Sequence, residues 1–148
     1  MVLHGVSMGA ATVMMTSGEP LPEYVKCFVE DCGYTNVWDE FAGQLQEQFG
    51  LPPFPLMYAT SLLCQLRYGW NFNEASALGQ VRECRYPMLF IHGNTDSFVP
   101  TSMVYPLYEA KADPKELWIA EDAEHALSYH EHKADYIAKI KAFCTSPN

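Results

Sequence analysis

Gly5-Val6-Ser7-Met8-Gly9 is the most informative segment of this sequence for the fold. The apolar residues 1–3 before it predict a short strand, and the small residues of 10–16 after it predict a helix. A serine between a strand and a helix, in the pattern Gly-x-Ser-x-Gly, is typical of a nucleophile elbow, in which the serine has a positive φ. We expect both glycines to be required, because a Cβ at either position would clash with the strand or the helix. The turn would place Ser7 at a helix N-terminus, where unpaired N–H groups stabilise an oxyanion.

The composition is that of one globular domain. With 148 residues, of which 49% are hydrophobic, the chain can bury a core without disulfides. Its 9 basic and 18 acidic side chains give a formal charge of -9, and Lys and Arg form no cluster. This charge argues against nucleic acids and anionic membranes as partners, because phosphate groups bind to clustered cations. The sequence has no run of 18 apolar residues and no signal-peptide pattern, so it predicts no membrane segment and indicates no compartment.

The spacing of cysteines and histidines predicts no metal site and no cofactor. The five cysteines are an odd number without CxxC spacing, which favours buried free thiols over a disulfide framework or a zinc site. They are Cys27, Cys32, Cys64, Cys84 and Cys144. His130 and His132 are two residues apart, so their side chains would diverge on a helix and would not share a metal ion.

Strand and helix patterns alternate along the rest of the chain. Apolar runs predict strands at 24–30, 86–92 and 117–119. Helical patterns occupy 37–49, 55–68, 75–83, 101–110 and 129–143. This order predicts an α/β fold, with a parallel sheet of about four strands flanked by helices.

Three polar side chains each follow a predicted strand. Ser7 follows the first strand, Asp96 follows the strand at 86–92, and His125 follows the strand at 117–119. The carboxyl ends of parallel strands meet at one edge of a sheet. We therefore expect these three side chains to lie together.

Three segments carry a family resemblance: His-Gly-Val-Ser-Met-Gly-Ala-Ala at 4–11, Leu-Phe-Ile-His-Gly-Asn-Thr-Asp-Ser-Phe-Val-Pro at 89–100, and Ala-Glu-His-Ala at 123–126. With them the chain resembles the C-terminal half of an α/β-hydrolase, over nearly all of its length. The second segment is similar to that family's acid loop, and a lone histidine after the last strand is similar to its base. The resemblance implies that Ser7 is the nucleophile, His125 the general base and then acid, and Asp96 the carboxylate that fixes the imidazole tautomer.

Each of these roles has an alternative. Asp96 could serve only as a cap for the turn at 97–101. Glu30 and Asp31 are alternative acids, because some members of the fold place the acid after the preceding strand. The other histidines are expected to be packed at strand ends, as His4 and His92, or exposed at the start of the last helix, as His130 and His132.

The oxyanion site is expected to be incomplete in these 148 residues. The N–H of Met8, the residue after the nucleophile, should supply one donor. In the family, the second donor comes from a glycine-rich loop in the N-terminal half of the fold, which has no counterpart here. The loss of one donor costs about 3 kcal/mol of transition-state stabilisation, so reduced or absent activity is expected. We interpret residues 1–148 as a truncated domain.

Residues 37–78 stand where many α/β-hydrolases insert a helical lid, between core segments 1–36 and 79–148. The insertion is rich in aromatic residues: Trp38, Phe54, Tyr58, Tyr68, Trp70 and Phe72. These residues predict either an apolar pocket for an acyl or aryl group or simply the core of the insertion itself.

The resemblance implies a serine hydrolase that acts on a small-molecule carboxylic ester. A serine peptidase or amidase is an alternative, because the acyl chemistry is the same and the specificity lies in the pocket. A third hypothesis is a catalytically incomplete fragment. In that case the elbow strand is a sheet edge with unpaired N–H and C=O groups near residues 2–4, which predicts a homodimer paired across a twofold axis.

Overall fold

Four parallel strands form the sheet of this protein. The structure is a computed structural model and describes residues 1–145. The strands are β1 (Val2–Val6), β2 (Cys27–Asp31), β3 (Met88–Gly93) and β4 (Lys115–Ala120). They are hydrogen-bonded in the order β1-β2-β3-β4, and every neighbouring pair is parallel. The predicted α/β fold with a four-stranded parallel sheet is confirmed.

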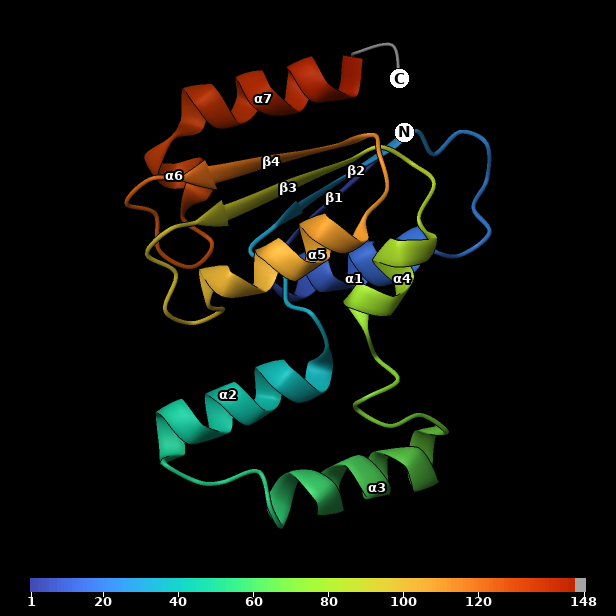
Figure 1. Cartoon of the computed structure of the whole chain (residues 1–148), viewed down its shortest axis with the longest axis vertical. Coiled ribbons are helices and arrows are strands. Elements are labelled where there is room, and N and C mark those ends of the chain that lie inside the picture. Colours follow the sequence, from blue (N-terminus) through green and yellow to red (C-terminus); the bar gives the residue numbers. More distant parts are fainter. Residues whose placement is uncertain (146–148) are drawn as a thin grey trace.

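Helices cover both faces of this sheet (Figure 1). They are α1 (Met8–Ser17), α2 (Val37–Phe49), α3 (Leu56–Tyr68), α4 (Ala77–Glu83), α5 (Val104–Ala110), α6 (Ser128–Glu131) and α7 (Lys133–Thr145). Helices α1, α4 and α5 lie on one face and α7 on the other, whereas α2 and α3 form a further layer beyond α1 and α5 (Figure 1). None of the helices in residues 1–145 is long and apolar enough to cross a membrane.

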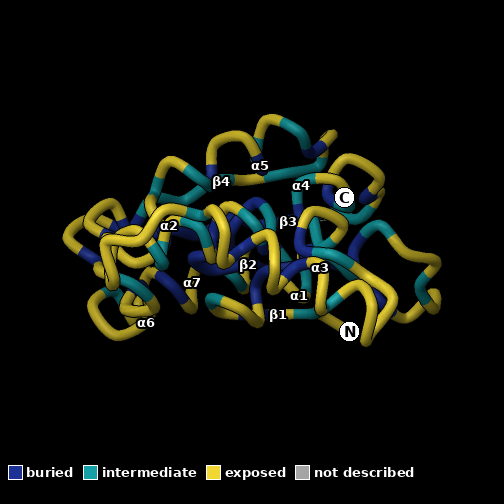
Figure 2. Tube along the Cα trace, turned by 90° about the horizontal axis from the view of Figure 1, so that it is seen from below, coloured by how far each residue is buried: buried dark blue, intermediate teal, exposed yellow. Residues whose placement is uncertain are grey.

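The core lies on both faces of the two central strands. All residues of β2 and β3 are buried, as expected for parallel strands covered by helices on both faces (Figure 2). One cluster lies under α1, α4 and α5: it includes Met14, Phe28, Val81, Phe90 and Leu107. The other lies under α7: it includes Cys27, Val29, Leu89, Ile91, Tyr136 and Phe143. The alternation of side chains along each strand divides its residues between the two clusters.

Strand β2 is shorter at its start than the predicted strand at 24–30. The Val25 N–H bonds the carbonyl of Pro22 in a turn, and the Lys26 N–H bonds the carbonyl of Met1. Regular pairing with β1 begins only at Cys27, opposite Val2. An apolar pattern predicts that Val25 is buried, which is correct, but it does not show whether the Val25 backbone is hydrogen-bonded to a neighbouring strand.

The predicted helix at 129–143 is two helices with a break at His132. This residue leaves the helical region, with φ -124° and ψ 42°. Its Nε2 donates to the carbonyl of Glu121 at 2.6 Å, and its ring contacts Trp118. These contacts to β4 and its following loop turn the chain between α6 and α7, so a pattern confined to residues 129–143 did not indicate the break.

The helix predicted at 101–110 starts differently from the expected cap. Residues Thr101–Met103 form a single 3-10 turn before α5. The Thr101 hydroxyl donates to the carbonyl of Gly93 at 2.6 Å instead of capping the helix. Pro106 is the third residue of α5, where its missing N–H leaves no helical bond unmade, as predicted.

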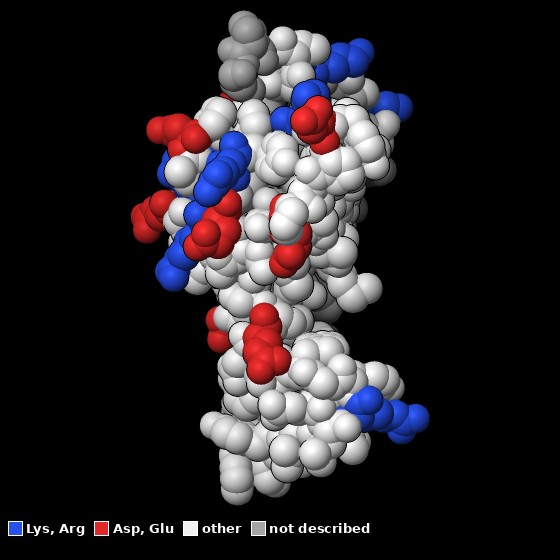
Figure 3. All heavy atoms as spheres, turned by 90° about the vertical axis from the view of Figure 1, so that its right-hand side faces the viewer, with Lys and Arg blue, Asp and Glu red and all other residues white. Residues whose placement is uncertain are grey.

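The insertion at 37–78 packs its aromatic rings largely against one another. Asn36 caps α2 by accepting from the Asp39 N–H at 2.7 Å. Edge-to-face contacts join Trp38 to Tyr58 and Phe41 to Phe72. The outer side of the layer remains apolar and exposed, and the side seen in Figure 3 carries few charged groups. Exposed apolar residues there include Phe54, Leu62, Leu63, Leu66 and Tyr68.

The two glycines of the elbow motif, Gly5 and Gly9, differ in whether a side chain would fit at their position. A Cβ on Gly5 would overlap the carbonyl of Gly9, because α1 crosses directly over the end of β1. A Cβ on Gly9 would meet nothing within 4 Å. The expectation that both glycines are sterically required is therefore wrong for Gly9, whose Cα–H points into open space.

We expect opposite effects from alanine at these two positions. Gly5→Ala must push α1 away from β1 and should lower the free energy of unfolding by about 2 kcal/mol or more. Gly9→Ala adds a helix-favouring residue without a clash and should raise it by up to about 1 kcal/mol. Urea unfolding of both variants measures the difference. Equal destabilisation by the two alanines would contradict this account of the elbow.

Candidate active site

Ser7 occupies a strained turn between β1 and α1. Its φ of 56° and ψ of -120° lie in a region that non-glycine residues rarely adopt. The Ser7 N–H donates to the carbonyl of Asp31 at 2.8 Å, which continues the β1–β2 ladder into the turn. The Ser7 carbonyl accepts from the Ala11 N–H at 3.0 Å, the first bond of α1. The strain is thus held by the sheet on one side and by the helix on the other.

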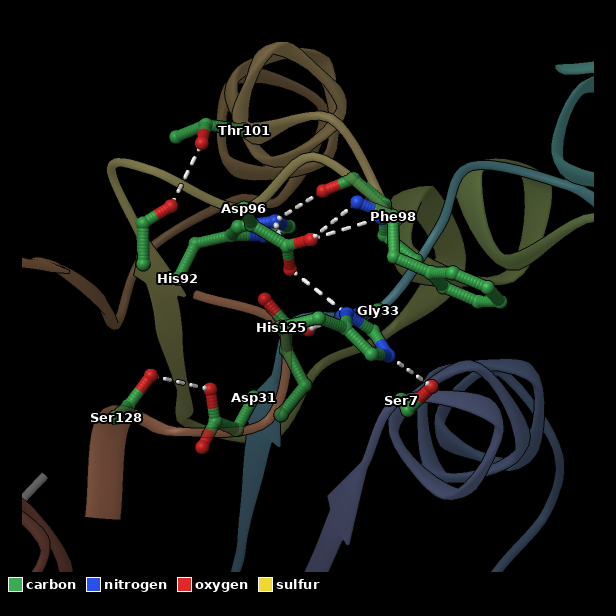
Figure 4. A network of polar contacts seen from close by, with 12 residues as sticks. Ser7, Asp31, Gly33, His92, Asp96, Phe98, Thr101, His125 and Ser128 are labelled. Carbon is green, nitrogen blue, oxygen red and sulfur yellow. Dashed lines mark hydrogen bonds and ion pairs between the residues drawn. The ribbon is translucent and has the colours of Figure 1, made fainter. Parts of the chain in front are cut away.

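A chain of two hydrogen bonds joins Ser7, His125 and Asp96 (Figure 4). His125 lies in the loop after β4, and its Nε2 accepts from the Ser7 Oγ at 2.7 Å. Its Nδ1 donates to the Asp96 Oδ2 at 2.8 Å. The imidazole also lies against the Phe98 ring, with centroids 4.9 Å apart. Hydrogen bonds at both ring nitrogens and this ring contact together fix the orientation of His125.

The two oxygens of Asp96 have separate partners. Oδ1 accepts from the N–H groups of Phe98 and Val99 at 3.0 and 2.9 Å, which is the capping role considered for this residue. Oδ2 accepts from His125. Burial raises the pKa of Asp96, but hydrogen bonds from His125 and His92 and the Val99 N–H outweigh burial and hold the pKa well below its usual range. Asp96 is therefore ionised at neutral pH.

The alternative acids lie close by but have other partners. The Asp31 Oδ1 accepts from the Ser128 Oγ, and its Oδ2 accepts from the Tyr136 hydroxyl, both at 3.0 Å. Glu30 is fully buried, and its Oε2 accepts from the Gly33 N–H at 3.0 Å. Burial raises the pKa of both carboxyls, so both tend towards the neutral form. Neither has a hydrogen bond to His125 among the described residues.

None of the remaining histidines bonds Ser7 among the described residues, but the His92 Nε2 lies 3.4 Å from the Asp96 Oδ2. The His4 Nε2 donates to the Tyr136 hydroxyl at 2.8 Å, and the His92 Nε2 donates to the carbonyl of Val99 at 2.9 Å. His92 is fully buried. His130 is exposed and bonds Glu131, whereas His132 bonds a backbone carbonyl.

Met8 is the first residue of α1 and is 70% exposed. The N–H groups of a helix's first turn have no partner within the helix. The Met8 N–H therefore stands beside Ser7 with the positive end of the α1 dipole, where negative charge on a substrate oxygen would be stabilised.

One family model covers this strand, turn and loop pattern. Residues 1–146 match the model described as "Prolyl oligopeptidase family". The chain belongs to the prolyl oligopeptidase family. It is also similar to the "Uncharacterized protein YqkD" of Bacillus subtilis (strain 168), with 33% identity over 146 residues that cover 99% of this chain and 48% of that protein. The chain thus spans about half the length of the curated relative that it matches.

Solved structures with the same fold include esterases and peptidases of the α/β-hydrolase superfamily. The esterase domain of a Rhodothermus marinus protein has a TM-score of 0.68 at 22% identity, over 95% of this chain and 59% of that one. A Pyrococcus furiosus esterase has a TM-score of 0.69 at 20% identity, over 96% and 51%. A Pyrococcus horikoshii acylaminoacyl peptidase has a TM-score of 0.68 at 16% identity, over 99% and 24%. These likenesses confirm the α/β-hydrolase fold.

Two further residues with positive φ surround the Ser7 turn in this member of the prolyl oligopeptidase family. Cys32, directly after β2, has φ 50°, and Ala126, directly after His125, has φ 61°. Burial and the charge of Asp31 raise the pKa of the Cys32 thiol well above its usual value, although the nearby N–H groups of Ser7 and Ala126 lower it. Backbone with positive φ from three loops therefore meets around one buried thiol. The Gly-x-Ser-x-Gly motif predicted the positive φ of Ser7, whereas those of Cys32 and Ala126 have no local signal in the sequence.

Helix α2 brings another carboxyl towards His125. Gln44 donates from Nε2 to the carbonyl of Phe98, which fixes this face of α2 against the loop that carries Asp96. Glu40 lies one turn earlier on the same face and is only 5% exposed. The amphipathic pattern of 37–49 predicted the helix, but only the tertiary structure shows which loop it meets.

Glu40 titrates in the neutral range because of this position. Burial raises its pKa from 4.5 to about 7, and the charge of Asp96 acts in the same direction, whereas His125 and Gln44 lower it. No lysine or arginine within residues 1–145 forms an ion pair with Glu40. A change in pH near neutrality therefore changes the charge beside the His125 imidazole.

Proposed function

We propose that this protein is a serine hydrolase that cleaves small-molecule carboxylic esters through an acyl-enzyme on Ser7. The hydrogen-bonded chain from Ser7 Oγ through the His125 imidazole to Asp96 Oδ2, with distances of 2.7 and 2.8 Å, is the observation that carries the proposal. These distances match the geometry in which a histidine takes the proton of a serine nucleophile. Membership of the prolyl oligopeptidase family supports the same class of chemistry.

The first half-reaction forms the acyl-enzyme. Ser7 Oγ attacks the ester carbonyl while His125 Nε2 takes the hydroxyl proton, and the ionised Asp96 stabilises the imidazolium. The Met8 N–H donates to the oxyanion of the tetrahedral intermediate. As the intermediate collapses, His125 gives its proton to the alkoxide leaving group. In the second half, His125 activates a water molecule that hydrolyses the acyl-enzyme and returns the proton to Ser7.

An ester is proposed as the substrate because esterases are among the similar structures. An ester has a more electrophilic carbonyl and a better leaving group than an amide, so its cleavage needs less stabilisation. Amide or peptide hydrolysis is the alternative, and the peptidases among the similar structures support it.

The proposal gives the insertion at 37–78 the role of a lid between core segments 1–36 and 79–148. Gln44 of this insertion bonds the carbonyl of Phe98, and the charge of Glu40 interacts with that of His125. A depression of about 290 Å³ between α2 and α3 is lined by apolar side chains next to these residues, including Phe41, Leu45 and Phe72. An acyl or aryl group of the substrate fits the chemistry of this lining.

Fluorophosphonate labelling tests the proposal. We expect one covalent adduct, mapped by mass spectrometry to Ser7, and hydrolysis of short p-nitrophenyl esters faster than of the matching anilides. Ser7→Ala should lose the adduct and lower ester turnover by about 1,000-fold or more. Ser102→Ala, which removes an exposed hydroxyl, is the matched control and should keep both. An adduct on another residue, or ester turnover that survives Ser7→Ala, contradicts the proposal.

A second candidate role is self-association through the edge of the sheet. Strand β1 pairs only with β2 among residues 1–145, and its Val2 and Val6 are each 40% exposed. Beside this edge, a groove of about 570 Å³ runs between β1 and α7, lined by apolar groups of Val6, Tyr129, Ile137 and Ile140. Unpaired N–H and C=O groups beside an apolar groove favour pairing with the same strand of a second copy.

Light scattering coupled to size-exclusion chromatography tests this association. We expect a dimer at micromolar concentration and a shift towards monomer in Val2→Lys, because a charged side chain on an edge strand opposes pairing. Leu66→Lys, which places the same charge on the exposed outer side of α3, should leave the dimer intact. A wild-type monomer under these conditions counts against the second role.

A further inference from the structure

Three potential metal ligands lie together under the Ser7 turn. The Cys32 Sγ, a carboxylate oxygen of Asp96 and a ring nitrogen of His125 are all within 4.8 Å of one another. They come from the loops after β2, β3 and β4, three neighbouring strands of the sheet. Cys32 is 1% and Asp96 6% exposed, whereas the His125 side chain is 21% exposed. His125 is therefore the one of the three ligands that solvent reaches most easily.

We propose that Cys32, Asp96 and His125 form an inhibitory binding site for a thiophilic divalent cation of the Zn²⁺ class. The inhibitory part of the proposal rests on the proposed hydrolase function, whereas binding of the cation does not. Thiolate, imidazole and carboxylate are the three ligand types that Zn²⁺ takes in proteins, and water can supply a fourth position. Hard cations such as Mg²⁺ and Ca²⁺ prefer all-oxygen sites and are not expected here.

The Cys32 thiol keeps its proton when no cation is bound, because burial and the charges of Asp31 and Asp96 raise its pKa by more than the N–H groups of Ser7 and Ala126 lower it. A bound divalent cation makes a coordinating thiol lose this proton. Asp96 Oδ1 is held by the N–H groups of Phe98 and Val99, which leaves Oδ2 to face the cation. Bonds from the surrounding backbone thus orient the Asp96 carboxylate before the cation arrives.

Binding would require a defined movement of protons. The Cys32 thiol loses its proton to solvent, while Asp96 is already a carboxylate. The His125 Nδ1, which now donates to Asp96 Oδ2, must be free of its proton to bind the cation, so the ring proton moves to Nε2. The bound state therefore contains Cys32 as thiolate and neutral His125 with the opposite tautomer, and one proton is released for each cation bound.

This change of tautomer removes the base for the reaction. In the structure, His125 Nε2 accepts from the Ser7 Oγ at 2.7 Å. With a proton on Nε2, the ring can only donate to Ser7 and cannot take its proton. The cation thus blocks the attack by Ser7 without occupying the place of the substrate.

Titration with Cd²⁺, a spectroscopic substitute for Zn²⁺, tests the site in the full chain. We expect an ultraviolet thiolate-to-cadmium charge-transfer band that saturates at one equivalent and is reversed by EDTA. Cys32→Ser keeps a small polar side chain at this position but removes the thiolate, and should abolish this band. Cys84→Ser, at a buried cysteine outside the site, is the matched control and should keep it.

A second variant separates the site from folding defects and from catalysis. His125→Ala should weaken Cd²⁺ binding by more than about 100-fold, because even the loss of residues that only support a metal ligand costs 10 to 100-fold. Ser7→Ala should leave the band and its affinity unchanged, so the site can be tested even if the protein proves not to be a hydrolase. Zn²⁺ should also slow fluorophosphonate labelling of Ser7, and EDTA should restore it. A missing wild-type band, or an equal band in Cys32→Ser, overturns the proposal.

Discussion

The Ser7 hydroxyl reaches His125 because parallel strands end at the same edge of one sheet. Each of the residues Ser7, Asp96 and His125 follows a different strand, and only the parallel order β1-β2-β3-β4 brings the following loops together. The bond from the Ser7 N–H to the Asp31 carbonyl ties the strained turn to the neighbouring strand. The close approach of α1 at Gly5 holds the turn from the other side. Distortion of this edge would separate all three residues at once.

Asp96 shows how one side chain can be both structural and chemical. One oxygen organises its loop through the N–H groups of Phe98 and Val99, and the other orients His125. The two interpretations of this residue from the sequence are therefore compatible, because each uses a different oxygen. The same loop receives Gln44 from α2. Hydrogen bonds in this way connect Asp96, His125 and the insertion at 37–78.

Patterns in the sequence were informative where the structure is local. Apolar runs, glycines and prolines along the chain predicted the four strands and most helix limits, and the Gly-x-Ser-x-Gly motif predicted the turn at Ser7. The errors arose where the three-dimensional arrangement decides the outcome. The bond from His132 to the carbonyl of Glu121 breaks the last helix, and the Cα–H bonds of Gly9 point into open space, so a Cβ there would not clash. Glu40 and Cys32 were missed because α2 and the β2 loop reach His125 only in three dimensions.

The rate at which a fluorophosphonate labels Ser7 in Asp96→Asn tests whether Asp96 activates Ser7 through His125. The asparagine oxygen can still accept from the Phe98 and Val99 N–H groups, so the loop should keep its fold. The amide nitrogen donates and cannot accept from His125 Nδ1, so the imidazole loses the tautomer that takes the Ser7 proton. The account predicts labelling slower by about 1,000-fold or more, with thermal unfolding close to that of the wild type. Labelling at the wild-type rate would contradict it.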